Sequence, residues 1–226
     1  LNRRYRLGYE IYMVNGLGDG IVANEDGATR ISGGKSMEIL EEDNNGVPSF
    51  TGRLKVENRS FGEVGFSYYG GVYNSYQMEG MMVDEKRNLR IIATDYDLKI
   101  KRFHLRSEFV SATVDVPEGL DELFGQEQWG VYTEINFDYL RGRIFGFDNS
   151  RMIATVRLEK VDLNVGKFES TKTNIGDETV RLTIANSFRP VENAVLKIVY
   201  QYNWMRDFTD NPVRTAGVQF GVAAYF

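Results

Sequence analysis

The sequence predicts an all-β protein: an antiparallel, up-and-down transmembrane β-barrel that occupies residues 1–226 as a single domain. Three observations lead to this fold class. Apolar and polar residues alternate over many stretches of about eight residues. The connections between these stretches are of two lengths, short and long. No run of about 18 apolar residues exists, and the mean hydropathy is −0.36, which excludes a transmembrane helix but not a barrel whose strands are half polar.

The alternation marks the individual strands. In the segment 194–204, Leu196, Ile198 and Tyr200 fall on one face while Lys197 and Gln201 fall on the other. A period of two is the signature of a strand with one apolar face, and only 36–42 suggests a short helical turn. Ten strands are predicted, at 5–14, 50–57, 63–73, 90–99, 102–114, 129–139, 152–161, 180–188, 194–204 and 216–226.

The connections support a membrane barrel. Long polar segments at 18–48, 74–89, 116–128 and 164–178, and one of middle length at 206–213, alternate with short ones at 58–62, 99–101 and 190–193. Short turns on one side and long loops on the other are typical of outer-membrane barrels. The segment 140–151 breaks this rule, and we expect an extended turn or a β-bulge there.

Aromatic residues are predicted at both membrane interfaces. If the long loops lie outside the cell, Trp129 and Trp204 fall at the extracellular ends of their strands, whereas Tyr139, Phe188 and Phe226 fall at the opposite ends. Amphipathic rings favour the boundary between lipid and water. A soluble β-barrel would show the same alternation with its apolar face turned inwards, so the aromatic belts and the unequal loops are what favour outer-membrane lipid as the partner.

The polar face of such a barrel would line its lumen. Charges of this kind usually pair across strands and stiffen the wall, and the alternative is that some basic residues form a constriction that favours anions. The predicted pore-lining residues are Arg53, Lys55, Glu57, Asp95, Asp97, His104, Arg106, Glu108, Glu134, Arg157, Glu159, Arg181 and Lys197.

Composition argues against several other functions. Cysteine is absent, and the formal net charge of −5 without a cluster of Lys and Arg argues against a nucleic-acid partner. His104 is the sole histidine, and Ser107, three residues later on a strand, points to the opposite face, so no nucleophile and base pair is expected. We therefore predict no enzyme activity, no metal site and no cofactor.

Short segments of the chain stand in an order that resembles a known family. They are YEIY at 9–12, NGL at 15–17, GRL at 52–54, GFSYYGG at 65–71, ATDY at 93–96, LRSEFV at 105–110, GVYTE at 130–134 and VRLE at 156–159. In this order they resemble the phosphate-selective porin O and P family of bacterial outer-membrane channels. The strand that ends at Phe226 likewise resembles the closing strand of outer-membrane barrels.

The resemblance implies a porin-like channel in the bacterial outer membrane for passive diffusion of small hydrophilic solutes, with a preference for anions such as phosphate. Family members commonly have about sixteen strands, so this chain is either the C-terminal portion of a longer porin or a smaller barrel closed by ten strands. Two other functions remain open: a non-conducting barrel that serves as a structural or partner subunit of an envelope complex, with the loop 18–48 as its docking surface, and a soluble secreted ligand-binding β-barrel. For the channel and for the structural subunit, a homo-oligomer is among the predicted assemblies.

Overall fold

The chain is all-β. The computed structural model describes residues 4–35, 45–60 and 62–225. Across these residues, antiparallel strands are joined by turns and loops, and the helical content is two short 3-10 helices, η1 (Asp19–Ile21) and η2 (Ile31–Gly34). The helical turn predicted at 36–42 and the predicted interface residue Phe226 lie outside the described residues.

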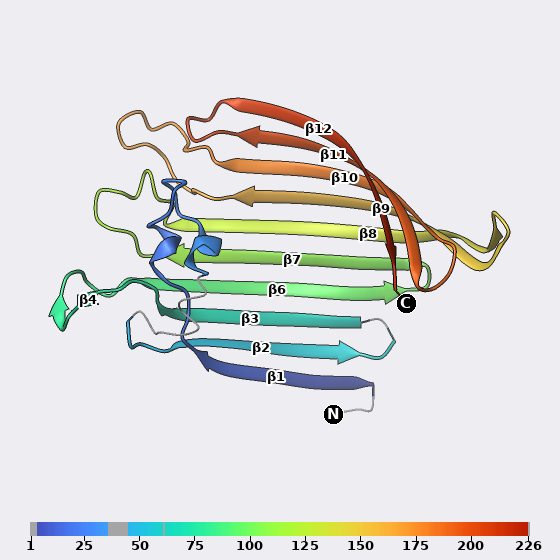
Figure 1. Cartoon of the computed structure of the whole chain (residues 1–226), viewed down its shortest axis with the longest axis horizontal. Helices are drawn as coiled ribbons and strands as arrows, with labels where there is room; N and C mark the ends of the chain where they lie inside the picture. The colour runs from blue at the N-terminus through green and yellow to red at the C-terminus, as the bar shows by residue number, and fades with distance from the viewer. Residues whose placement is uncertain (1–3, 36–44, 61, 226) are drawn as a thin grey trace.

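One large sheet contains ten strands, which confirms the predicted number of strands. Every strand pairs with its neighbours in chain order and runs antiparallel to them (Figure 1). The strands are β1 (Tyr5–Val14), β2 (Ser49–Asn58), β3 (Gly62–Val72), β6 (Asn88–Ile100), β7 (Phe103–Val114), β8 (Glu127–Ile144), β9 (Phe147–Asp162), β10 (Glu178–Arg189), β11 (Ala194–Arg206) and β12 (Pro212–Ala224). A separate small hairpin, β4 (Gln77–Met78) and β5 (Met81–Met82), was not predicted because strands of two residues show no periodicity.

The long and the short connections emerge at opposite ends of the sheet, as the sequence predicts. The described segments 15–35, 45–48, 73–87, 115–126, 163–177 and 207–211 lie at one end, which we call the loop end (Figure 1). The short connections after β2, β6, β8 and β10 lie at the other end, which we call the turn end. This asymmetry gives the sheet a direction, and the ten strands of the large sheet run between the two ends.

The segment 140–151 is a bulged hairpin. Strands β8 and β9 continue beyond their predicted limits and meet at a turn of two residues, Phe145 and Gly146, both with positive φ (53° and 86°). The pairing register shifts between Asp138 and Leu140 and again after Gly142. Each shift breaks the alternation of faces, which is why the period of two fades from the sequence here. The hairpin extends past the other turns (Figure 1).

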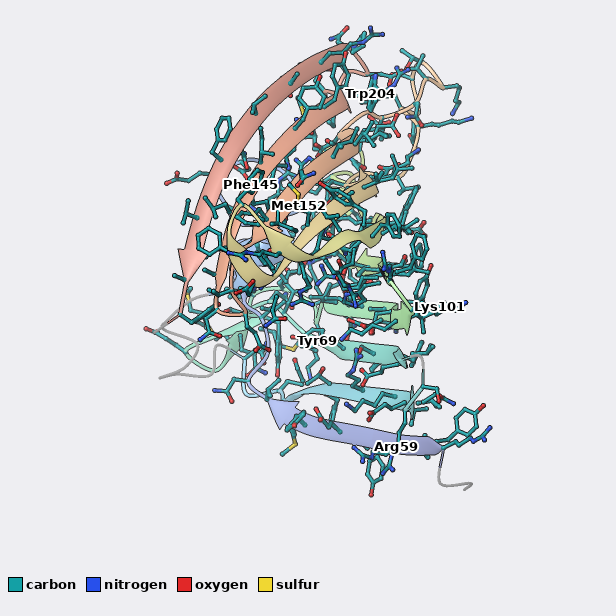
Figure 2. The ribbon with its side chains drawn as sticks, turned by 90° about the vertical axis from the view of Figure 1, so that its right-hand side faces the viewer. Arg59, Tyr69, Lys101, Phe145, Met152 and Trp204 are labelled. Atoms are coloured by element: carbon teal, nitrogen blue, oxygen red, sulfur yellow. The ribbon has the colours of Figure 1, made fainter. Side chains whose placement is uncertain are left out.

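The sheet is staggered and open. Starting from Tyr9 in the middle of β1, the row of directly paired residues crosses all ten strands and ends at Arg214, close to the loop end of β12. Stagger of this kind accompanies the strand tilt of β-barrels. Figure 2 shows a curved wall in which β1 and β12 are separate edges, and these two strands are not paired with each other. The structure is therefore an open sheet of ten strands that is not closed into a barrel.

A small apolar core lies at the loop end. Its buried members are Ile21, Tyr73, Leu89, Val114 and Val116. Leu89 and Val114 are directly paired on β6 and β7, and Ile21 comes from η1, so the core forms where the segment 17–34 packs against the sheet. Burial of these side chains fixes the first long loop in place.

Candidate pore-lining surface

The two faces of the sheet differ in chemistry. Directly paired residues point to the same face, and successive residues of a strand point to opposite faces. The register therefore places Leu54, Phe66 and Phe109 on one face, which we call the outer face. It places Asp95 and Glu108 together on the other, the inner face. Charged residues of the outer face, such as Arg90, Lys160 and Glu178, lie near the loop end of their strands.

Exposure is the reverse of that in a water-soluble protein. On β8, the outer-face residue Ile135 is 45% exposed, while its neighbour Glu134 on the inner face is 8% exposed. On β9, Val156 is 48% exposed and its neighbour Thr155 is 5% exposed. Water-soluble proteins bury aliphatic side chains and expose carboxylates. Exposed large apolar side chains lie on the outer face of all ten strands of the sheet. A contiguous apolar surface of this kind indicates contact with lipid or with a partner.

Ion pairs join the inner face across β2, β3 and β6. Arg53 donates two hydrogen bonds to the Asp95 carboxylate, at 2.6 and 2.8 Å, and a third to Glu63 at 3.0 Å. Lys55 binds the other oxygen of Glu63 at 3.0 Å. The two-pronged arrangement of a guanidinium on a carboxylate is the strongest geometry for such a pair. These contacts fix the three strands relative to one another.

A second network continues over β7 to β10. Glu134 accepts a hydrogen bond from Arg106, and the Arg157 guanidinium lies 3.7 Å from its other oxygen. Arg157 also donates to Glu159 at 2.8 Å and lies over the Tyr132 ring, with its guanidinium carbon 3.9 Å from the ring centre. Each charge thus has neighbours of opposite sign, which offsets the cost of sheltering it from water.

Every predicted pore-lining residue lies on the inner face, since each shares its face with Asp95 or Glu134 by register. The structure brings most of them into salt bridges, and His104 forms a hydrogen bond of 2.7 Å with Asp97. Glu108 and Lys197 form no salt bridge with a described residue. The sequence therefore predicts the shared face correctly, while their role in lining a pore stays a prediction.

The first long loop covers the inner face at the loop end. The Leu17 amide donates to the Tyr69 hydroxyl at 3.0 Å, and the Gln128 side chain donates to the Thr29 carbonyl at 2.9 Å. Arg30 forms a salt bridge of 3.0 Å with Asp177 in the connection from β9 to β10. Figure 1 shows η1 and η2 in front of the sheet at this end. The described part of the loop 18–48 therefore packs against the strands.

The turn end of the inner face carries a concentration of positive charge. Arg141 on β8 is directly paired with Arg151 on β9, which is directly paired with Arg189 on β10. Like charges in directly opposite positions destabilise a sheet. The three arginines line a hollow of about 420 Å³ together with Asp138, the carboxylate that Arg141 binds at 2.7 Å. Other basic residues of the same hollow are Lys99, Lys101, Arg102, His104 and Arg106.

This basic row was missed at the level of the sequence. Arg141 and Arg151 fall in the segment 140–151, where the bulges hide the strand pattern, and a Phe-Gly turn is not among the common hairpin signals. Arg189 continues the polar face of the predicted strand 180–188, but its position alone does not indicate the other two arginines. Only the register of the finished hairpin shows that the three guanidinium groups are neighbours.

The predicted interface aromatics lie near the ends of their strands on the outer face. Trp129 and Trp204 are close to the loop end, where Lys160 lies over the Trp129 ring at 5.4 Å from its centre. At the turn end, Asn186 donates to the Tyr139 hydroxyl at 2.8 Å, and Phe188 packs edge to face against Phe145. The described members of the two belts thus occupy the expected ends.

The histidine and the serine three residues after it lie on opposite faces of the sheet, as the sequence predicts. Ser107 donates its hydroxyl proton to the Tyr132 carbonyl on the outer side, while His104 binds Asp97 on the inner face. Among the described residues, no group of three or more His, Asp or Glu side chains is placed to hold a metal ion.

Comparison with protein-family models gave no match, and neither did comparison with curated proteins or with solved structures. No helix in the described part of the chain has the length and apolar character needed to cross a membrane. The porin resemblance therefore rests on the sequence segments, and the functional argument rests on the geometry of the sheet.

Proposed function

We propose that this chain forms the wall of a bacterial outer-membrane β-barrel that works as a porin-like channel for small hydrophilic solutes. The observation that carries the proposal is the inverted exposure of the two faces, seen in Ile135 and Glu134. Lipid supplies the apolar environment that the outer face needs, and the inner face supplies a polar lining. A soluble barrel would need a partner that covers the same outer face.

Closure completes the proposed barrel. In lipid, the unpaired backbone groups of β1 and β12 would be costly, so both edges must pair with strands. The two strands run antiparallel, which allows them to pair with each other or with further strands between them. A closed barrel of about ten strands is largely filled by its own side chains, whereas about sixteen strands leave an aqueous channel. An aqueous channel therefore requires strands in addition to the ten of this sheet.

The proposed channel prefers anions. Arg141, Arg151 and Arg189 lie side by side with one carboxylate, Asp138, in their hollow. An anion that passes through would relieve their mutual repulsion, and guanidinium groups bind phosphate oxygens well. This charge distribution supports the anion preference that the family resemblance implies.

A second candidate is a non-conducting barrel that acts as a structural or partner subunit. The observation in its favour is the segment 17–34, which packs across the loop end of the inner face. If it closes the mouth of the barrel, solutes cannot pass.

Conductance in planar lipid bilayers distinguishes these functions. The protein extracted from its native membrane is expected to give stepwise conductance, with a reversal potential in a KCl gradient that indicates chloride preference. Arg151→Gln should lower the ratio of chloride to potassium permeability, while Arg143→Gln, on the same hairpin but outside the directly paired row, should leave it almost unchanged. Absence of conductance would reject the channel and favour the structural subunit. Equal effects of the two variants would reject the basic row as the selective element.

A further inference from the structure

The small hairpin β4–β5 concentrates sulfur at the tip of a loop. Three of the seven methionines of the chain, Met78, Met81 and Met82, fall within five residues. Their exposed fractions are 67, 67 and 72%. Thioether side chains normally fill gaps in apolar cores, so three exposed ones at a single tip call for another role. The hairpin projects beyond the loop end of the sheet (Figure 1).

The register of the hairpin places two of the three sulfurs on one side. Met78 is directly paired with Met81 across a turn of two residues, Glu79 and Gly80, whose φ angles of 51° and 82° define a tight hairpin turn. Directly paired side chains start from Cβ atoms about 5 Å apart, so their flexible thioethers can reach one common ion. Met82 is paired with Gln77 and points to the opposite side.

The base of the hairpin is held firmly. The Val83 amide donates to the Tyr76 carbonyl at 2.9 Å. Arg87 donates to both oxygens of Asp84, at 2.9 and 2.8 Å, and Asn74 binds the same carboxylate at 3.2 Å. The exposed methionine pair therefore stands on a fixed backbone, and a ligand would have to order the two side chains but not the hairpin itself.

We propose that Met78 and Met81 form a binding site for a soft monovalent metal ion, copper(I) or silver(I). Soft thioethers select copper(I), and two sulfurs on one side of a hairpin suit an ion that accepts two ligands. Glu79, located between them in the turn, adds a negative charge that attracts a cation. Because a thioether has no proton to lose, binding at this site does not depend on pH in the range where histidine titrates.

Titration calorimetry of the full chain in detergent tests the site, with silver(I) as a probe that needs no reductant. One ion per chain is expected, with the same affinity at pH 5.5 and pH 7.5. Met78→Leu and Met81→Leu keep the side-chain volume and should each lower the affinity about tenfold or more. Met82→Leu, on the same hairpin and equally exposed, is the matched control and should change it less than about twofold.

Two results would overturn the proposal. If silver(I) binding survives in the Met78→Leu/Met81→Leu double variant, the ion binds elsewhere. If affinity falls sharply from pH 7.5 to 5.5, a histidine site accounts for it, and His104 is the sole candidate in the sequence. Neither result bears on conductance, so the metal site and the channel can fail independently.

Discussion

The same strands form the outer and the inner face of the sheet, but the two faces differ in chemistry and in exposure. At adjacent positions of β8, Ile135 is exposed and Glu134 is sheltered. The outer face has aliphatic and aromatic side chains with few neighbours above them, whereas the inner face is tied together by salt bridges such as Arg53 with Asp95. The difference teaches that the outer face of the sheet needs cover by lipid or by a partner, whereas the inner face is satisfied by its own side chains. It also shows that the charges of the inner face contribute to the cohesion of the wall.

The largest loss of stability is expected from a charge placed on the outer face. Ile198 lies on the outer face of β11, paired with Phe220, and Lys197 beside it lies on the inner face. Ile198→Arg should cost about 2–4 kcal/mol in a bilayer, because a guanidinium near the middle of the membrane loses its hydration. Lys197→Ala should cost less than about 0.5 kcal/mol. Urea titration of the protein folded in lipid vesicles measures both values.

Equal costs for these two variants would mean that the faces are assigned wrongly. The protein and its Ile198→Arg variant can also be compared in detergent-free buffer. If the protein stays folded and monodisperse in that buffer and tolerates Ile198→Arg, it is a soluble barrel with a covered outer face.

A smaller effect is expected on the inner face. Glu134→Gln removes the carboxylate that Arg106 and Arg157 share, and leaves two guanidinium groups facing each other in a sheltered place. The free energy of unfolding should fall by about 1–3 kcal/mol. Glu57→Gln breaks a more exposed pair with Arg6, 3.5 Å long, and should cost at most about 1 kcal/mol. Chemical denaturation of both variants in the same lipid gives the ranking, and a larger loss for Glu57→Gln would contradict it.

Much of the sheet could be predicted because its signals are local. Alternation places Leu196 and Lys197 on opposite faces whatever the partner strand, so the ten strands and the shared face of the charges follow from the sequence. The position of the segment 17–34 could not be predicted, since it depends on contacts such as Arg30 with Asp177 between distant parts of the chain. The row from Arg141 to Arg189 depends in turn on bulges that leave no clear pattern.

Closure of the sheet is the part that neither alternation nor register decides. Both describe a strand and its neighbours, and β1 and β12 each have a neighbour on one side in the sheet. In the proposed barrel, whether the edges meet each other depends on the total number of strands, which is a global property. The intact mass of the protein isolated from its native source, compared with the 25.8 kDa of this chain, tests for further strands on the same polypeptide.

The smallest effect is expected in a region that belongs to neither face. At the base of the β4–β5 hairpin, the hydrogen bonds from Arg87 lower the pKa of Asp84 to about 2, from an ordinary value of 3.8. A carboxyl whose pKa is depressed on folding stabilises the folded loop above pH 4 and loses this contribution as the pH falls towards 2. Because Asp84 is partly exposed, the contribution is at most about 1 kcal/mol.

Pepsin, which is active at acidic pH, can measure this loss as the rate of cleavage within 73–87, normalised to cleavage of a free peptide at each pH. Cleavage of the loop should rise between pH 4 and pH 2, and Asp84→Asn should show the faster rate already at pH 4. The strands provide the contrast, since many backbone pairings and salt bridges hold them at once, and they should resist pepsin over the same range. If cleavage of the loop and cleavage of the strands rise together as the pH falls, the hairpin does not open as a separate unit. The loop and the sheet would then share one stability.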